Sequence, residues 1–404
     1  MAARRPQADT HPTTPAPATG EELVERARAL QPWLRAQAER GEADRAVSPA
    51  VVDALADAEV FRLLTPRRLG GQETGLRTLM EVSEVLGEAD GSTAWTAVSV
   101  AVTNRLACRF PERAQDEVFG ADPHARVTGA TAPTGIGRRV PGGWAVTGRW
   151  SHNSAAPYAT WAVVGALLQD GTGTATYRAL VLVPASELVR EDTWHTVGMR
   201  GTARHTLIAR DIMVPDHRVL SVPAAAGGSC PPSSRPDGVP PALPLGLAPM
   251  LSACLVGPLL GLGNAALAAV REAATHEPVP STVHGGPAGS VGVQIQLAEA
   301  ALQLRTARLH AYDAVDRIDR GCVDHAERAR VRAQAGHAAQ HVLTAVDTLL
   351  NVRGADAFAD TDPLQRIWRD AGIAARHAGL VPAVGYEVYG KALLGIEEPV
   401  GLVI

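Results

Sequence analysis

Aromatic residues and cysteines are scarce in this sequence. Phe, Trp and Tyr together make up 4% of its 404 residues, so there is no obvious aromatic cage for a large planar molecule. The four cysteines (Cys108, Cys230, Cys254 and Cys322) are far apart and include no CxxC pair. This spacing argues against a disulfide framework and against a structural zinc site. The 13 histidines include no HExxH motif, and we predict no metal ion.

An excess of one charge is also lacking. The 38 basic and 42 acidic residues give a formal net charge of -4, and both signs are spread along the chain. A protein that binds nucleic acid needs a clustered basic face to neutralise phosphates. We therefore predict no nucleic-acid partner.

Long apolar runs are missing as well. No continuous stretch approaches the roughly 20 apolar residues that a membrane helix needs, so no membrane association is predicted. Residues 1–20 are rich in Pro, Thr and Ala and have no apolar core, unlike a signal peptide. We expect this stretch to be a disordered leader and the protein to be cytoplasmic.

Residues 21–125 have helical periodicity. Apolar residues recur every three or four positions at Leu23, Ala27, Leu30, Leu34 and Ala38, as one buried face of a helix would. Ser48 and Pro49 are typical of an N-cap followed by the first helical residue. Further helices are predicted for 76–86 and from Asp90 through Val102. This region is expected to be an N-terminal helical domain.

Residues 126–222 have the pattern of strands. Gly142-Gly143 indicates a hairpin between 138–140 and 144–150. The nearly continuous apolar runs 161–168 and 177–183 are typical of strands covered on both faces. Residues 206–214 are expected to form another strand.

The remainder of the chain divides into a loop and a helical region. Residues 223–249 are rich in Pro, Gly and Ser and have no periodicity, so they are predicted to form a loop or lid. Residues 250–404 are predicted to be helical, with helices over 251–276, 293–319 and 324–352 and one or two more over 363–394. The sequence thus predicts an α+β protein that is mostly α, with helices, a compact sheet and a helical bundle in that order.

Several motifs within these regions resemble one known family. They are Gly91-Ser92-Thr93-Ala94-Trp95, Gly148-Arg149-Trp150-Ser151 with Asn153-Ser154, Gly198-Met199-Arg200-Gly201-Thr202, Asp211 to Pro215, Arg366 to Asp370, and Arg376-His377-Ala378-Gly379. In this order, from about Glu21 onward, the chain resembles the acyl-CoA dehydrogenase superfamily. The branch that it resembles is the two-component flavin-dependent monooxygenases.

This resemblance implies a fold, a reaction and partners. The fold is an N-terminal helical domain, a middle β-barrel and a C-terminal four-helix bundle, and the assembly is a homotetramer. Reduced FMN or FAD comes from a separate flavin reductase. The expected reaction is hydroxylation of an aromatic or polyketide-like small molecule with O2, in natural-product biosynthesis.

Two departures separate this chain from the dehydrogenases of that family. Ala378 occupies the position of their catalytic glutamate, and alanine cannot accept a proton. Residues 251–263, where some relatives place that glutamate, contain no carboxylate. Val283-His284-Gly285-Gly286 replaces the Arg-x-x-Phe-Gly segment that helps to hold FAD. We therefore do not expect acyl-CoA oxidation or tight retention of FAD.

The resemblance assigns catalytic roles to His377 and Ser154. The Ser154 hydroxyl would form a hydrogen bond near flavin N5. This would help to preserve the hydroperoxide that reduced flavin forms with oxygen in these hydroxylases. His377 would either deprotonate a phenol or donate a hydrogen bond to that hydroperoxide. The simpler interpretation is that Ser154 ends a strand and that His377 has a structural role.

Further residues are assigned to cofactor or substrate by the same resemblance. Trp95, Thr131, Thr134, Trp150, Ser154, Arg353 and Gly354 are expected at the flavin, and Thr103, Asn104 and His377 at the substrate. For the tryptophans, packing in the core is the alternative. Arg200 and Arg204 are either phosphate or substrate contacts or exposed charges on the sheet. Alternation along the strand predicts that His152 points away from Ser151 and Asn153.

Other functions remain open at this point. A dehydrogenase or oxidase of the same fold would reduce tightly bound FAD with its own substrate. An N-hydroxylase of an amino sugar would use the same oxygen chemistry. A non-catalytic paralogue would bind no reduced flavin.

Overall fold

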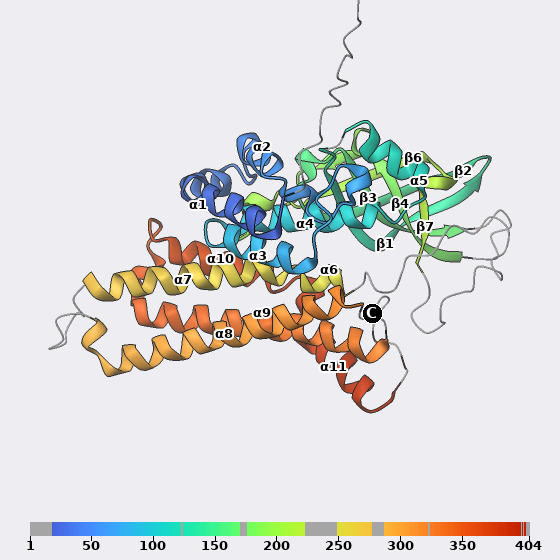
Figure 1. Cartoon of the computed structure of the whole chain (residues 1–404). Helices are drawn as coiled ribbons and strands as arrows, with labels where there is room; N and C mark the ends of the chain where they lie inside the picture. Colours follow the sequence, from blue (N-terminus) through green and yellow to red (C-terminus); the bar gives the residue numbers. More distant parts are fainter. Residues whose placement is uncertain are drawn as a thin grey trace, which may run out of the picture.

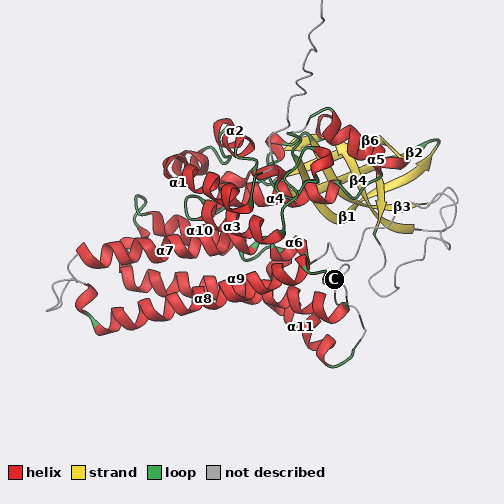
Figure 2. Ribbon diagram, viewed as in Figure 1, coloured by secondary structure: helices red, strands yellow, loops and turns green. Residues whose placement is uncertain are grey.

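The computed structural model describes residues 18–122, 124–169, 176–222, 249–276, 287–321, 324–396, 398 and 400 (Figure 1). Nearly all of the predicted leader (1–20) and of the predicted loop (223–249) lies outside these residues, as does the segment 283–286. The described chain is mostly helical with one sheet, and the helices and the sheet occupy different parts of the molecule (Figure 2).

The N-terminal helices begin where the sequence predicts. They are α1 (Gly20–Ala43), α2 (Pro49–Asp57), α3 (Leu76–Gly87), α4 (Gly91–Ala107) and α5 (Glu112–Gln115). The Ser48 side chain accepts a hydrogen bond from the Val51 N–H, which confirms the predicted cap. The Asp90 carboxylate caps α4 by accepting from the Thr93 N–H at 2.7 Å. Most of α4 is buried on all sides, so it lies inside the molecule rather than on its surface.

The strands form one sheet of seven strands. They are β1 (Val127–Val140), β2 (Gly143–Asn153), β3 (Trp161–Gln169), β4 (Thr176–Pro184), β5 (Val189–Glu191), β6 (His205–Pro215) and β7 (Val219–Ser221). The order is β5-β6-β2-β1-β3-β4-β7, and β1 pairs antiparallel with β2 and parallel with β3. The turn between β1 and β2 has Gly142 at φ +81°, which confirms the predicted hairpin.

The predicted β-barrel is not confirmed. Within the described residues β5 and β7 are the two edges of the sheet, and no pairing joins them. Both edge strands are only three residues long, which is too short to continue a ladder around a barrel. The sheet is therefore open.

The C-terminal helices confirm the predicted ranges, except that the first of them is divided in two. They are α6 (Met250–Ala253), α7 (Val256–His276), α8 (Val291–Asp319), α9 (His325–Arg353), α10 (Pro363–Ala374) and α11 (Pro382–Leu393). The helix predicted to start at Leu251 is divided because Pro258 has no N–H to donate to the Cys254 carbonyl. The last helical region is divided by a 3-10 turn over Ala378–Leu380, followed by Pro382 at the start of α11.

One helical segment is more apolar than we predicted from the sequence. Met250–Ala274 is long and apolar enough to span a membrane, so the expectation that no stretch approaches that length is wrong. However, 72% of its most apolar window is buried inside the protein. The core helix of a folded domain can be equally long and apolar. Helix α7 is such a core helix, because it is packed among α3, α8, α9 and α10.

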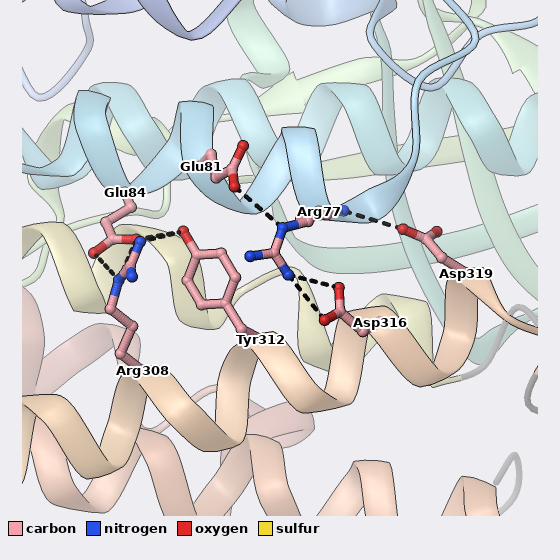
Figure 3. A network of polar contacts seen from close by, with 7 residues as sticks. All are labelled: Arg77, Glu81, Glu84, Arg308, Tyr312, Asp316 and Asp319. Carbon is pink, nitrogen blue, oxygen red and sulfur yellow. Dashed lines mark hydrogen bonds and ion pairs between the residues drawn. The ribbon is translucent and has the colours of Figure 1, made fainter. Parts of the chain in front are cut away.

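A polar network joins the N-terminal helices to the C-terminal ones (Figure 3). Glu84 of α3 is buried and accepts hydrogen bonds from Arg308 Nε at 3.0 Å and from the Tyr312 hydroxyl at 2.6 Å, both on α8. Asp319 caps the start of α3 by accepting from the Leu76 N–H at 3.0 Å. Arg77 is paired with Asp316 at 2.8 Å. These contacts fix α3 against α8, next to the helix that lines the site described below.

Candidate active site

A cavity of about 700 Å³ lies where α4, the sheet and the turn between α10 and α11 meet. The described residues that line it include Trp95, Thr103, Thr131, Ser154 and His377 from the predicted site, together with His152, Trp194 and Arg204. No aspartate or glutamate is among these lining residues. The polar side chains of the lining therefore include hydroxyl groups, imidazoles and the guanidinium groups of Arg204 and Arg376.

Ser154 and Trp95 are held together at the end of β2. The Trp95 indole Nε1 donates to Ser154 Oγ at 3.2 Å, and both side chains are largely buried. The Ser154 carbonyl accepts from the Thr128 hydroxyl at 2.6 Å. Because the serine oxygen accepts from the indole, its own proton remains available to donate into the cavity.

His377 lies on the 3-10 turn, not within the last helix as the sequence reading assumed. Its Nδ1 accepts from the Gly379 N–H at 3.0 Å, and its ring meets the Trp95 ring edge-on at a centroid distance of 5.6 Å. Burial, and then the charges of Arg204 and Arg332, lower the pKa of His377 to about 3. The ring is thus neutral near pH 7. Since Nδ1 accepts, the proton is on Nε2, which has no hydrogen-bond partner among the described residues.

His152 lines the cavity, contrary to the expectation from strand alternation. Its backbone has φ +68°, in the left-handed region, and the register of β2 against β6 shifts between Trp150 and Asn153. This irregularity breaks the alternation, so the side chain no longer points away. The pKa of His152 is lowered by burial and by the charge of Arg204.

Arg204 is a buried cation of the cavity wall. Only 9% of the residue is exposed, so it is not an exposed charge on the sheet. Its guanidinium lies 5.0 Å from the Trp194 ring and 5.7 Å from the Trp95 ring. Burial lowers the pKa of Arg204 to about 10, which leaves it charged near pH 7. Arg200, in contrast, donates to the backbone carbonyls of Glu42 and Thr196 outside the cavity lining.

Thr131 reaches the cavity through a bulge in β1. The register of β1 against β3 shifts between Ala130 and Gly135, so the residues between them leave the ladder. Opposite the bulge is Gly165, where an added Cβ would lie 2.3 Å from the Thr131 carbonyl oxygen. The bulge therefore depends on glycine at this position. Thr103 lines the same cavity and donates its hydroxyl proton to the Ser99 carbonyl at 2.8 Å.

Three predicted site residues lie outside the cavity lining. Trp150 is buried in the core of the sheet, where its Nε1 donates to the Gly165 carbonyl at 2.6 Å. Asn104 is buried and bonds to the Phe61 and Ala125 carbonyls and to the Val127 N–H. Thr134 is largely exposed and donates to the Arg149 carbonyl at 2.9 Å. These placements favour structural roles, and for Trp150 they favour the alternative of core packing.

Arg353 and Gly354 are also apart from the cavity. Arg353 ends α9 and pairs with Asp362 at 3.4 Å, and Gly354 follows it with φ +72°. Sequence reasoning missed Trp194, which lies in the loop between β5 and β6. The sequence feature that could have indicated Trp194 is its place in a polar stretch of a chain with few aromatic residues.

The donor set of the cavity fits a reduced flavin. Ser154 offers a hydroxyl proton, the β1 bulge offers the Thr131 hydroxyl and backbone groups outside the ladder, and Trp95 offers an apolar surface. Ala378, which the resemblance places at the position of the dehydrogenase glutamate, lines the cavity. The missing carboxylate leaves no residue of that type to remove a proton from an acyl chain.

Comparisons with known proteins agree with this geometry. Residues 253–382 match the family "acyl-CoA dehydrogenase, C-terminal domain". The chain is 31% identical to the flavin-dependent monooxygenase oxygenase subunit HsaA of Mycobacterium tuberculosis, over 91% of this chain and 94% of that protein. It is 30% identical to the oxygenase component of the FADH(2)-dependent resorcinol hydroxylase of Rhizobium sp., over 93% and 94%.

A solved structure supports the same relationship. XiaF from Streptomyces sp., solved with FADH2 and glycerol, superimposes with a TM-score of 0.87 and 35% identity, covering 95% of this chain and 98% of XiaF. The chain belongs to the oxygenase components of the flavin-dependent monooxygenases, which have the acyl-CoA dehydrogenase fold.

Proposed function

We propose that this chain is the oxygenase component of a two-component monooxygenase that hydroxylates an aromatic or polyketide-like small molecule. Reduced FMN or FAD would come from a separate flavin reductase, as the term oxygenase component implies for the relatives. When bound, reduced flavin supplies the electrons that activate O2. A role in natural-product biosynthesis and a cytoplasmic location are parts of this proposal.

The observation that carries the proposal is the composition of the cavity. Trp95, Ser154 and His377 converge there, and no described lining residue is a carboxylate. A dehydrogenase of this fold needs a base for the substrate α-proton, and a hydroxylase does not. The cavity wall is also largely apolar around these groups, which favours chemistry that must exclude water.

Each of the three converging residues has a distinct task in this proposal. Ser154 would hold a proton at Oγ toward the flavin ring, with its oxygen fixed by the Trp95 indole. His377 would donate from Nε2 to an oxygen atom, because Nδ1 already accepts from the Gly379 N–H. Deprotonation of a phenol by His377 is the weaker hypothesis, since an imidazolium would present an Nδ1 proton to that same N–H.

Oxygen labelling tests the proposed reaction. The full chain would be mixed with a generic flavin reductase, NADH, FMN or FAD, and a panel of phenolic compounds under ¹⁸O2. The proposal predicts products that carry one ¹⁸O atom and that form only when reductase is present. Products without ¹⁸O, together with reduction of the flavin by the substrate itself, would instead support a dehydrogenase.

A homotetramer is the assembly that we propose. The exposed face of α8 bears Val291, Ile295, Leu302 and Leu309, which are 56–67% exposed and spaced by four, seven and seven residues. In Figure 1, α8 lies along the border of the helical region. A regular apolar stripe of this kind is typical of a helix that packs against another protein surface.

A further inference from the structure

We propose that Arg204 is the receptor for an anionic oxygen of the substrate, so that the cavity selects aromatic compounds bearing a carboxylate or an ionised hydroxyl. This inference rests on the proposed function and specifies its substrate class.

The guanidinium is buried without a counter-charge. Arg204 has no hydrogen-bond or ion-pair partner among the described residues, and its buried Nε is unsatisfied. Buried arginine normally pairs with a carboxylate, because an unpaired charge away from water is strongly destabilising. A buried guanidinium without a counter-charge is suited to pair with an anionic group of a bound ligand.

Its position is fixed by two aromatic rings. The guanidinium lies near the Trp95 and Trp194 rings, at 5.7 and 5.0 Å from their centroids. Such cation–π contacts orient the planar group but leave its N–H donors free for an oxygen ligand. Arg204 also lines the cavity, so a bound molecule can reach it.

The surroundings favour a negative ligand over a neutral one. No acidic side chain is among the described residues of the lining. The two imidazoles that feel the charge of Arg204, His377 and His152, have lowered pKa values and are neutral near pH 7. The cavity thus has a net positive charge without any internal compensation.

Arg204 and His377 lie against the same ring of the cavity wall. The Arg204 guanidinium is 5.7 Å and the His377 ring 5.6 Å from the centroid of the Trp95 ring. An anionic oxygen bound at Arg204 would therefore be close to the Nε2 donor of His377. This arrangement assigns Arg204 to the substrate in preference to the flavin.

Binding of matched probes tests the inference. We would measure the affinity of the full chain for 2-naphthoate, 2-naphthol and 2-naphthamide by calorimetry, with and without FMN or FAD. Arg204→Met removes the charge, and Arg204→Lys keeps it without the planar fork. Arg376→Met is the matched control, because Arg376 lines the same cavity but donates to the Gly372 carbonyl.

We expect the loss of the Arg204 charge to weaken the binding of the anionic probes selectively. Arg204→Met should weaken binding of the anionic probe by about 30-fold or more, Arg204→Lys by less, and Arg376→Met by no more than about threefold. Naphthoate alone would identify a carboxylate receptor. Naphthol bound in its ionised form, seen by the red shift of its absorption band, would identify an ionised hydroxyl.

Equal binding of naphthamide and the anionic probes would overturn the inference, as would anionic binding that Arg204→Met leaves unchanged. The dissociation constant of reduced flavin, measured anaerobically, separates the two claims. If Arg204→Met weakens flavin binding and not probe binding, Arg204 serves the cofactor. If the wild-type chain binds no reduced flavin, the proposed function fails instead.

Discussion

The turn that bears His377 determines which nitrogen of the ring faces the cavity. His377 is the N-cap of the turn over Ala378–Leu380, and its Nδ1 accepts from the Gly379 N–H. The tautomer is therefore fixed by the backbone rather than by a carboxylate. A neutral ring held in this way acts as a hydrogen-bond donor at Nε2.

This geometry predicts different effects of two substitutions at His377. Asparagine can accept from the Gly379 N–H but cannot reach the cavity, whereas glutamine can place an N–H near the position of Nε2. His377→Asn should lower the yield of hydroxylated product per flavin oxidised by about 10²–10³-fold, and His377→Gln by much less. Product and H2O2 would be quantified together.

A pH profile separates this role from base catalysis. Because the pKa of His377 is lowered to about 3, its protonation should produce no limb in the wild-type profile between about pH 5 and 8. A limb near pH 6.5 that disappears in His377→Gln would contradict the donor role.

Single residues also show which parts of the site could be predicted from the sequence. Trp95, Thr103, Thr131, Ser154 and His377 do share one cavity, as the resemblance implied. Asn104 follows Thr103 directly and yet bonds only to backbone, because successive residues on a helix face different directions. His152 reaches the cavity through a left-handed backbone that periodicity cannot reveal.

At the scale of elements, α10 is attached to the loop between β5 and β6 by a buried carboxyl group. Asp370 accepts from the Met199 N–H, and Gly198 approaches the α10 backbone so closely that a Cβ would lie 2.2 Å from the Arg369 carbonyl oxygen. Burial, together with the charge of Asp90, raises the pKa of Asp370 to about 7. The packing of α10 therefore depends on protonation.

The sign of this dependence follows from the raised pKa. The stability contributed by protonated Asp370 is complete below its ordinary pKa of 3.8 and is lost as the pH rises to about 7. Asp370→Asn keeps an acceptor for the Met199 N–H and stays neutral. We predict that it increases the free energy of unfolding at pH 8 by on the order of 2 kcal/mol, with a smaller gain near pH 5.

Denaturant unfolding at several pH values measures this effect. Asp53→Asn makes the same chemical change at an exposed position of α2 and should leave the pH dependence unchanged. An Asp370→Asn protein with the wild-type pH dependence would show that the carboxyl is already ionised in the folded state.

The elements themselves were largely predictable from the sequence. Helical spacing and caps located α1, α2 and α9, and the Gly142-Gly143 signal located the β1–β2 hairpin. The break before α7 was missed, since it depends on a proline removing one hydrogen bond within an apolar, helical pattern. The open edges of the sheet depend on contacts between distant strands, which periodicity does not specify.

At the scale of the whole molecule, the stripe on α8 predicts an association. Ile295→Glu with Leu302→Glu places two charges on the apolar face and should convert the proposed tetramer to smaller species. Ala29→Glu with Ala36→Glu adds the same charges at the same spacing on the exposed side of α1 and serves as the control. Size-exclusion chromatography with light scattering gives the masses. A wild-type monomer, or a tetramer unaffected by the α8 changes, would contradict the prediction.

The central claim is that the cavity shelters reduced flavin while it reacts with O2, and stopped-flow mixing tests this most directly. The full chain would be prepared anaerobically with reduced FMN or reduced FAD and then mixed with oxygenated buffer. The absorbance of oxidised flavin and the release of H2O2 would be followed over time. We predict that oxidised flavin returns after a lag and more slowly than in free solution, and that Ser154→Ala shortens the lag. Immediate return of oxidised flavin at the rate of free flavin, with equal release of H2O2, would contradict the account.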